Sequence, residues 1–164
     1  MKTIYFIRHA KSDWSVECDD FDRGLNKRGL GDVQLMTKRL KKYDIKPDII
    51  ISSPAKRALD TAEMIADRLN IAKKIFKTDI NLYLTSPKIY LDIIRQIDNK
   101  YSIVFIVGHN PTITEVCENL SGISIGNIPT CGIFSMEFNV KTFDEISPNS
   151  GKKLFFDFPK KHKT

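Results

Sequence analysis

The stretch Thr3-Ile4-Tyr5-Phe6-Ile7-Arg8-His9-Ala10-Lys11-Ser12 decides the fold of this 164-residue chain. Residues 3–7 are β-branched or aromatic, which predicts a short buried strand. An arginine and a histidine follow at once, at Arg8 and His9. In an open α/β sheet the carboxyl ends of the strands form the rim where ligands bind. We therefore expect both side chains to lie at that rim.

Strand and helix patterns alternate along most of the remaining chain. Apolar residues recur at helical spacing after Asn26, at Leu30, Val33, Met36 and Leu40. Further helices are predicted to begin at Ser53-Pro54, Ser86-Pro87 and Pro111, and strands to cover 48–51, part of 74–84, 102–107, 133–140 and 153–158. We expect the last two strands to be antiparallel and near the sheet edge. This order predicts an α/β fold, a three-layer α/β/α sandwich with a mostly parallel central sheet and helices on both faces.

Length and composition predict one domain over residues 1–164, with 159–164 as a flexible basic tail. The net charge of +6 suits acidic or phosphorylated partners, but no aromatic-interleaved basic stripe or nucleic-acid motif is present, so we expect no nucleic-acid binding. The three cysteines form no CxxC pair and predict reduced thiols in a cytoplasm. The residues near the N-terminus contain no long apolar run, so we expect neither a signal peptide nor a membrane span. The oligomeric state is not predictable from these features.

Three predicted strand ends carry polar side chains suited to phosphoryl chemistry. Arg8 and His9 follow the first strand, Arg57 lies one turn past the second, and His109 follows the strand over 102–107. An arginine offers a fork of donors that matches phosphate, and a neutral histidine offers a nucleophilic nitrogen near pH 7. Each residue alone is more often a surface residue than a catalyst, but the four together form a pocket for a dianion. No carboxylate cluster or Walker-type glycine loop is present, so we expect no metal and no cofactor.

The motifs Arg8-His9-Ala10, Ser52-Ser53-Pro54 with Arg57-Ala58, and Val107-Gly108-His109-Asn110-Pro111 occur in that order. They resemble the histidine phosphatase superfamily, also called phosphoglycerate mutase-like, over nearly the whole chain. The opening from Arg8 to Trp14 resembles the SixA-like phosphohistidine phosphatases within it. Ala10 stands where many members of the superfamily carry glycine.

The resemblance implies a role for each residue of the predicted pocket. His9 would be the nucleophile that becomes phosphorylated, and Arg8 and Arg57 would bind the phosphoryl oxygens. His109 would complete the pocket by stabilising the phosphoryl group. Ser12 is a further candidate for a phosphate contact through its hydroxyl group.

The general acid of the superfamily's phosphomonoesterases has no clear counterpart. Its expected position is about Leu84, which is apolar, and Asp79 lies five residues too early. General acid catalysis is typically worth about 10²–10⁴-fold for a poor leaving group, whereas the weaker P–N bond of phosphohistidine depends on it less. The absence of a general acid favours phosphohistidine on a protein as the substrate. A carboxylate from the 11–25 loop, such as Asp13, could still act as the acid. Whether Asp13 and Trp14 touch the substrate is open.

The leading hypothesis is a metal-independent phosphatase that hydrolyses protein phosphohistidine through phosphorylated His9. A phosphatase of a small phosphomonoester with an unassigned acid is one alternative. A non-catalytic module that binds phosphate or a phosphoprotein is another, although all four core residues are present. Mutase activity requires a pocket that encloses a bisphosphate, which this short chain has little spare length to build.

Overall fold

The computed structural model describes residues 1–163 and contains one six-stranded sheet in the order β3-β2-β4-β1-β5-β6. The strands are β1 (Lys2–Arg8), β2 (Ile49–Ser52), β3 (Phe76–Thr78), β4 (Ile103–Gly108), β5 (Ile133–Phe138) and β6 (Gly151–Asp157). Strands β3, β2, β4 and β1 run parallel, and β5 and β6 are antiparallel to their neighbours. The sheet is therefore mostly parallel with an antiparallel edge, as predicted.

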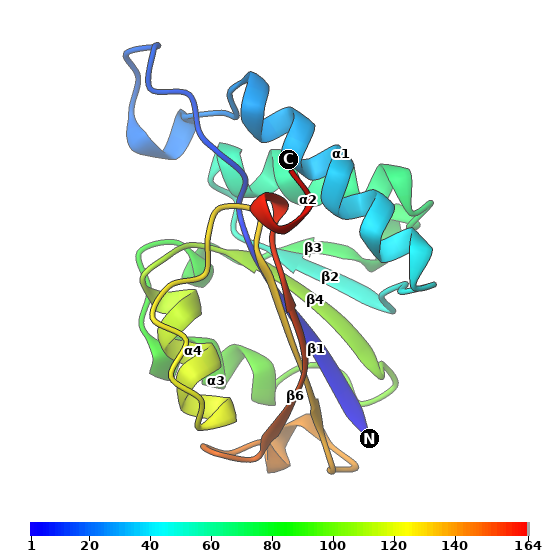
Figure 1. Ribbon diagram of the computed structural model, residues 1–164. Helices are drawn as coiled ribbons and strands as arrows, with labels where there is room; N and C mark the ends of the chain where they lie inside the picture. Colours follow the sequence, from blue (N-terminus) through cyan, green and yellow to red (C-terminus); the bar gives the residue numbers. More distant parts are fainter. Residues whose placement is uncertain (164) are drawn as a thin grey trace.

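Helices cover both faces of the sheet, which confirms the predicted three-layer sandwich. Figure 1 shows α1 (Lys27–Lys42) and α2 (Lys56–Arg68) on one face, and α3 (Pro87–Arg95) and α4 (Thr112–Ser121) on the other. The loop between β1 and α1 projects beyond these layers at the upper left and contains the short 3-10 helix η1 (Asp20–Asp22). This loop is the longest segment between a parallel strand and its helix, and it begins at the strand end that carries His9.

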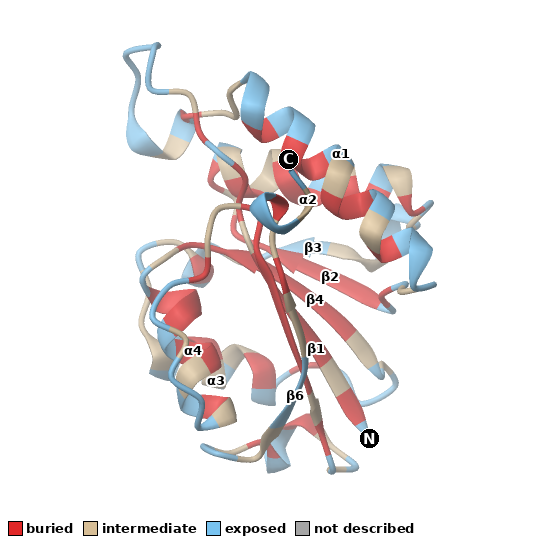
Figure 2. Ribbon diagram, in the orientation of Figure 1, coloured by how far each residue is buried: buried red, intermediate tan, exposed pale blue. Residues whose placement is uncertain are grey.

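Strand β1 divides its side chains between two hydrophobic cores. Ile4 and Phe6 pack in the core under α3 and α4, whereas Tyr5 and Ile7 pack in the core under α1 and α2. A strand buried on both faces has a continuous run of apolar residues instead of an alternating pattern, and this explains the sequence of 3–7. In Figure 2 the central strands and the inward helix faces are buried, and the outer helix faces are exposed.

Two local structures differ from the predictions. Helix α2 begins at Lys56, with Ala55 as its N-cap, and not at Pro54. The segment expected to be a flexible tail forms the 3-10 helix η5 (Pro159–His162).

Side-chain contacts hold this C-terminal segment against the body of the protein. His162 contacts the Asp157 carboxylate, and the Lys163 amino group contacts Asp32 of α1. Asp32 is buried, so its partner cation is needed to offset the cost of removing the carboxylate from water. Thr164, the last residue of the predicted tail, lies outside the described residues. Within residues 1–163 we find no helix with the length and apolar character that crossing a bilayer requires.

Candidate active site

The pairing of β1 with β4 brings two histidines together. Arg8 at the end of β1 lies opposite Gly108 at the end of β4, and the next residues along the two parallel strands are His9 and His109. Their ring centroids are 5.2 Å apart. Gly108 is required by the packing here, because a Cβ atom at this position would lie 1.9 Å from the hydroxyl oxygen of Tyr90.

His9 is buried and oriented by its own backbone. Its Nδ1 lies 2.7 Å from the carbonyl oxygen of Ala10, and since a carbonyl only accepts, we assign the proton to Nδ1. Burial, together with the positive charges of Arg57 and Arg8, lowers the pKa of His9 from 6.5 to about 4 despite this hydrogen bond. The ring is therefore neutral at pH 7 and its Nε2 carries a free lone pair, as a nucleophile requires.

His109 is fixed through Ser53, which lies between β2 and α2. The His109 Nε2 atom is 2.8 Å from Ser53 Oγ, which also accepts a hydrogen bond from the Ala55 backbone N–H. Burial lowers the pKa of His109 to about 3, and the neighbouring His9, Arg57 and Arg8 add to this effect. When the Ser53 hydroxyl donates to Nε2, the proton of the neutral ring resides on Nδ1. This Nδ1 atom is buried and has no hydrogen-bond partner among residues 1–163.

Arg8 presents a second buried polar atom without a partner. One terminal nitrogen of its guanidinium donates to the Ile128 carbonyl at 2.9 Å, but its Nε–H is buried and unpaired within the described chain. Burial lowers the pKa of Arg8, yet the group remains a cation because an arginine pKa exceeds about 12. A buried unpaired donor costs about 1–3 kcal/mol, so this donor and His109 Nδ1 would each be better satisfied by an acceptor that the protein itself does not supply.

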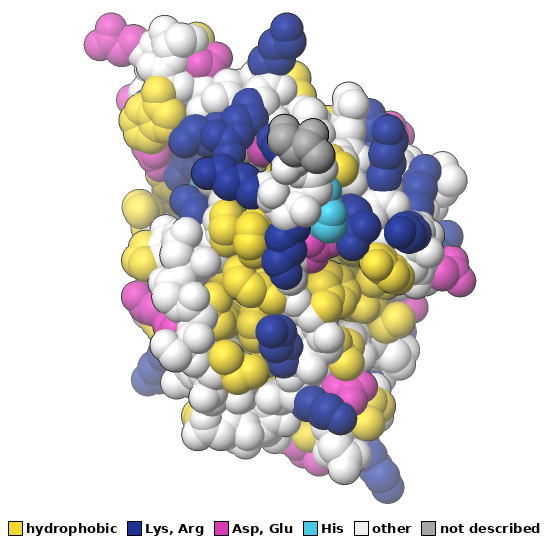
Figure 3. Space-filling model, viewed as in Figure 1, with side chains coloured by type: hydrophobic (Ala, Val, Ile, Leu, Met, Phe, Trp, Pro, Cys, Tyr) yellow, Lys and Arg dark blue, Asp and Glu magenta, His cyan; other side chains and the backbone are white. Residues whose placement is uncertain are grey.

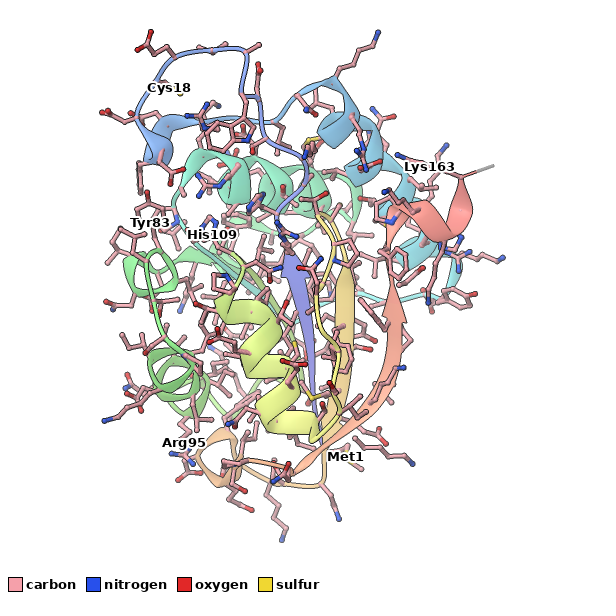
Figure 4. The ribbon with its side chains drawn as sticks, turned by 60° about the vertical axis from the view of Figure 1, so that its left-hand side comes forward. Met1, Cys18, Tyr83, Arg95, His109 and Lys163 are labelled. Atoms are coloured by element: carbon pink, nitrogen blue, oxygen red, sulfur yellow. The ribbon has the colours of Figure 1, made fainter. Side chains whose placement is uncertain are left out.

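Arg57 reaches the same place from the first turn of α2, where it binds the loop that follows β1. Its two terminal nitrogens donate to the Asp20 backbone carbonyl at 2.7 Å and to the Asp20 carboxylate at 3.0 Å. Tyr83 donates its hydroxyl proton to the same carboxylate at 2.7 Å, and its ring lies edge-on to His109 with centroids 5.6 Å apart. In Figure 4, Tyr83 and His109 lie together beneath the loop that carries Cys18.

The hydrogen bond from Tyr83, followed by the charge of Arg57, holds the pKa of Asp20 below its usual range. Asp20 is therefore a carboxylate at neutral pH and not a proton donor. Among residues 1–163, no three His, Cys, Asp or Glu side chains are grouped to hold a metal ion.

Comparison with known proteins relates this site to a family. The model of the histidine phosphatase superfamily (branch 1) matches residues 4–79, which include most of β1, Arg57 and β3. A SixA protein from Agrobacterium tumefaciens, described as a phosphohistidine phosphatase, has 25% identity and a TM-score of 0.81, with 96% of this chain and 98% of that chain covered. These findings support a relationship of the chain to the histidine phosphatase superfamily.

Two further comparisons show how far the likeness to known proteins extends. A tungstate complex of the protein histidine phosphatase SixA shares the fold, with a TM-score of 0.85, 20% identity, and 98% and 99% of the two chains covered. A 2,3-bisphosphoglycerate-dependent phosphoglycerate mutase from Thermoplasma acidophilum is 40% identical over 74 residues. That match covers 43% of this chain and 36% of the mutase, so the chain aligns with about a third of the mutase's length.

The structure brings four of the five predicted site residues into one cluster. His9, His109, Arg8 and Arg57 are linked by the ring contact and by the effects of the two arginines on both histidines. Ser12 is buried in an isolated β-bridge to Leu25, and its hydroxyl makes no hydrogen bond within residues 1–163. A phosphate contact from Ser12 stays a prediction.

Sequence analysis missed Asp20, Tyr83 and the second role of Ser53. It named Asp13 as the carboxylate of the loop, but Asp13 accepts hydrogen bonds from the backbone and hydroxyl of Ser15. The contact of Arg57 with Asp20 spans 37 positions, and that of Tyr83 with Asp20 spans 63. Neither hydrophobic periodicity nor a sequence motif predicts contacts between residues so far apart in the sequence.

The buried neutral histidines predict a loss of stability in mild acid. In the unfolded chain each histidine takes up a proton near pH 6.5, whereas folded His9 and His109 do so only near pH 4 and pH 3. The unfolded state binds more protons between these values, so the free energy of unfolding must fall as the pH falls below 6.5. For His9 alone the loss by pH 4 is roughly 3 kcal/mol.

Urea unfolding at pH 7.0, 5.5 and 4.5 measures this loss. The double variant His9→Gln/His109→Gln, which retains all other titrating groups, should lose less stability than the native chain over the same range. Equal losses in the two proteins would show that these histidines are not buried as neutral rings.

Proposed function

We propose that this chain is a phosphatase that hydrolyses phosphohistidine on a protein through a phosphorylated His9. The observation that carries the proposal is the neutral His9 ring, with an unprotonated Nε2, among two arginines and a second neutral histidine. The likeness to SixA proteins described as phosphohistidine phosphatases supports the substrate class. The relationship to the superfamily supports the reaction type.

In the first step, the His9 Nε2 lone pair attacks phosphorus. The new Nε2–P bond forms as the P–N bond of the substrate breaks, and the substrate imidazole leaves with the electron pair of that bond. This leaving group becomes neutral imidazole when its other ring nitrogen carries a proton taken from water. Arg8 Nε, the Arg57 fork and His109 Nδ1 would donate to the three phosphoryl oxygens, where charge spreads in the transition state.

In the second step, water attacks the phosphorus of phosphorylated His9. The Nε2–P bond breaks, orthophosphate leaves, and the electron pair returns to Nε2, which restores the neutral ring. The hydrogen bond from Nδ1 to the Ala10 carbonyl is present throughout, so the same nitrogen remains the nucleophile in every cycle. The sum is phosphohistidine plus water giving histidine plus orthophosphate.

The residues near the phosphoryl site favour a phosphoramidate over a phosphomonoester. Leu84 occupies the position expected for a general acid and is exposed. Asp20 is the carboxylate that contacts Arg57, but its lowered pKa leaves it without a proton to donate at neutral pH. An alkoxide leaving group would therefore lack an acid, whereas the imidazole of phosphohistidine depends less on one and can take its proton from water.

We further propose that no metal or cofactor takes part, because two arginines and His109 suffice to balance the phosphoryl charge. We also propose that the protein acts in the cytoplasm, with Cys18, Cys117 and Cys131 as free thiols and without nucleic-acid or membrane partners. Figure 3 shows several lysine and arginine side chains on the upper part of the face in view, and their positive charge suits phosphorylated partners.

The test is the rate of hydrolysis of a histidine-phosphorylated protein and of an alkyl phosphomonoester, glycerol 2-phosphate, both in the presence of EDTA. We expect fast release of orthophosphate from the protein and a rate at least about 10²-fold lower on the monoester, given the missing acid. Faster turnover of the monoester would favour the small-molecule phosphatase and show that an acid is present. Exchange of phosphate between phosphoglycerate isomers would favour a mutase, and vanadate binding without any turnover would favour a non-catalytic module.

A further inference from the structure

Two segments beside the proposed active site expose large apolar side chains. Leu84 is 85% exposed and Ile80 is 59% exposed on the segment between β3 and α3. Trp14 is 69% exposed and Val16 is 55% exposed on the loop between β1 and α1. We call these four side chains the apolar rim. Single exposed apolar residues are ordinary, but several of them on two segments that contact each other beside a functional site indicate a surface that binds another molecule.

Leu84 also has an unfavourable backbone conformation. Its φ angle is +51°, in the left-handed region that L-residues other than Asn and Asp seldom adopt. Three of the five non-glycine residues with positive φ are Asn or Asp. The other two are Leu84, which follows Tyr83, and Cys131, whose N–H donates to the His9 carbonyl. Backbone strain of this kind is found preferentially at functional sites. At Leu84 it accompanies an apolar side chain that is exposed to solvent.

The two segments of the rim are joined at the phosphoryl site. Tyr83 immediately precedes Leu84 and contacts the His109 ring, and the Phe21 ring packs against Tyr83 with centroids 5.2 Å apart. Arg23 stacks over Trp14 at 3.8 Å and donates to the carbonyls of Asp13 and Val16, which gives the loop a defined shape. Figure 3 shows hydrophobic side chains along the left-hand edge of the molecule, below the acidic tip of this loop.

We propose that the apolar rim binds the protein surface around the phosphohistidine, an inference that rests on the proposed function. The occupant is a folded protein that displays its phosphohistidine beside an apolar patch. A free phosphorylated metabolite offers no apolar surface to cover Leu84. Exposed carboxylates on the loop, at Glu17, Asp19 and Asp22, would repel a free anion but would suit basic side chains of such a protein.

The test compares two substrates that share the phosphoryl group. A folded protein phosphorylated on a surface histidine requires the rim, whereas free phosphohistidine reaches only the phosphoryl site. For Leu84→Asn we expect KM for the protein to rise about tenfold, in line with loss of one buried anchor. The value of kcat/KM for free phosphohistidine should stay within about twofold, because Leu84 touches no phosphoryl-binding group. Trp14→Ser should show the same split, and Ile123→Ser, which removes an exposed apolar residue after the carboxyl end of α4, should change neither substrate.

A second measurement separates binding from folding. Asn adopts the left-handed backbone conformation more readily than Leu. Leu84→Asn should therefore raise Tm by a few degrees while it raises KM for the protein substrate. An unchanged KM for the protein in both Leu84→Asn and Trp14→Ser would refute the proposal that the apolar rim binds the protein substrate. Equal losses of kcat/KM for the two substrates would refute it as well. Native protein that hydrolyses neither substrate would instead refute the proposed function, and the rim with it.

Discussion

Replacing His9 by alanine is expected to lower the rate of phosphohistidine hydrolysis by at least about 10⁴-fold, the scale found when a covalent nucleophile is removed. His9 supplies an unprotonated Nε2 atom as the nucleophile. The hydrogen bond from its Nδ1 to the Ala10 carbonyl orients the ring. The variant should also form no covalent phosphoenzyme. We would measure both the release of orthophosphate and the label retained on the denatured protein after brief exposure to a ³²P-phosphorylated substrate.

The chain offers a matched control for this experiment. His162 is the only histidine besides His9 and His109, and it contacts Asp157 at the C-terminal end of β6, away from both. His162→Ala should therefore retain the label, which should be stable in alkali and labile in acid, as a P–N bond is. Label retained by His9→Ala would assign the nucleophile to another residue, and full turnover by this variant would refute the covalent route.

The sheet and its strand ends were predictable because their signals are local. A buried parallel strand needs a run of apolar residues, and β1 and β4 have such runs directly before His9 and Gly108-His109. Because neighbouring parallel strands end at the same edge, their order in the sheet brings the histidines together without further information. The roles of Arg8, Arg57 and His109 came from a resemblance, and the structure supports them with proximity and with the unpaired atoms Arg8 Nε and His109 Nδ1.

The loop over the site was not predictable in the same way. Residues 11–25 have no period, and nothing in the sequence distinguishes Asp20 from Asp13, Asp19 or Asp22 as the partner of Arg57. Lys163, directly after η5, follows the same principle, since it pairs with an aspartate 131 positions earlier. The contact of Ser53 with His109 is equally distant in sequence, and the Ser53 side chain also accepts from Ala55 N–H as a cap would, although α2 itself begins at Lys56.

Replacing Arg57 by alanine is expected to reduce kcat/KM by about 10²–10³-fold, the loss typical of one donor to a transition-state oxyanion. The present contact of Arg57 with Asp20 adds a second expectation. The Asp20 carboxylate accepts from the guanidinium fork at 3.0 Å, so an incoming phosphoryl group must share or displace it. Asp20→Asn removes the competing charge and should tighten inhibition by orthovanadate, whereas Arg57→Ala should weaken it.

Arg57→Lys separates charge from geometry, because lysine keeps the positive charge but cannot offer two parallel donors. Its activity should lie between those of the native chain and Arg57→Ala. Arg68→Ala, in the last turn of the same helix, should leave kcat/KM and vanadate inhibition unchanged. If Asp20→Asn weakened vanadate inhibition as much as Arg57→Ala, the carboxylate would be holding Arg57 in place for the phosphoryl group and not competing with it. That result would make the ion pair a support of the site, and the loop would then have to stay closed for the reaction to proceed.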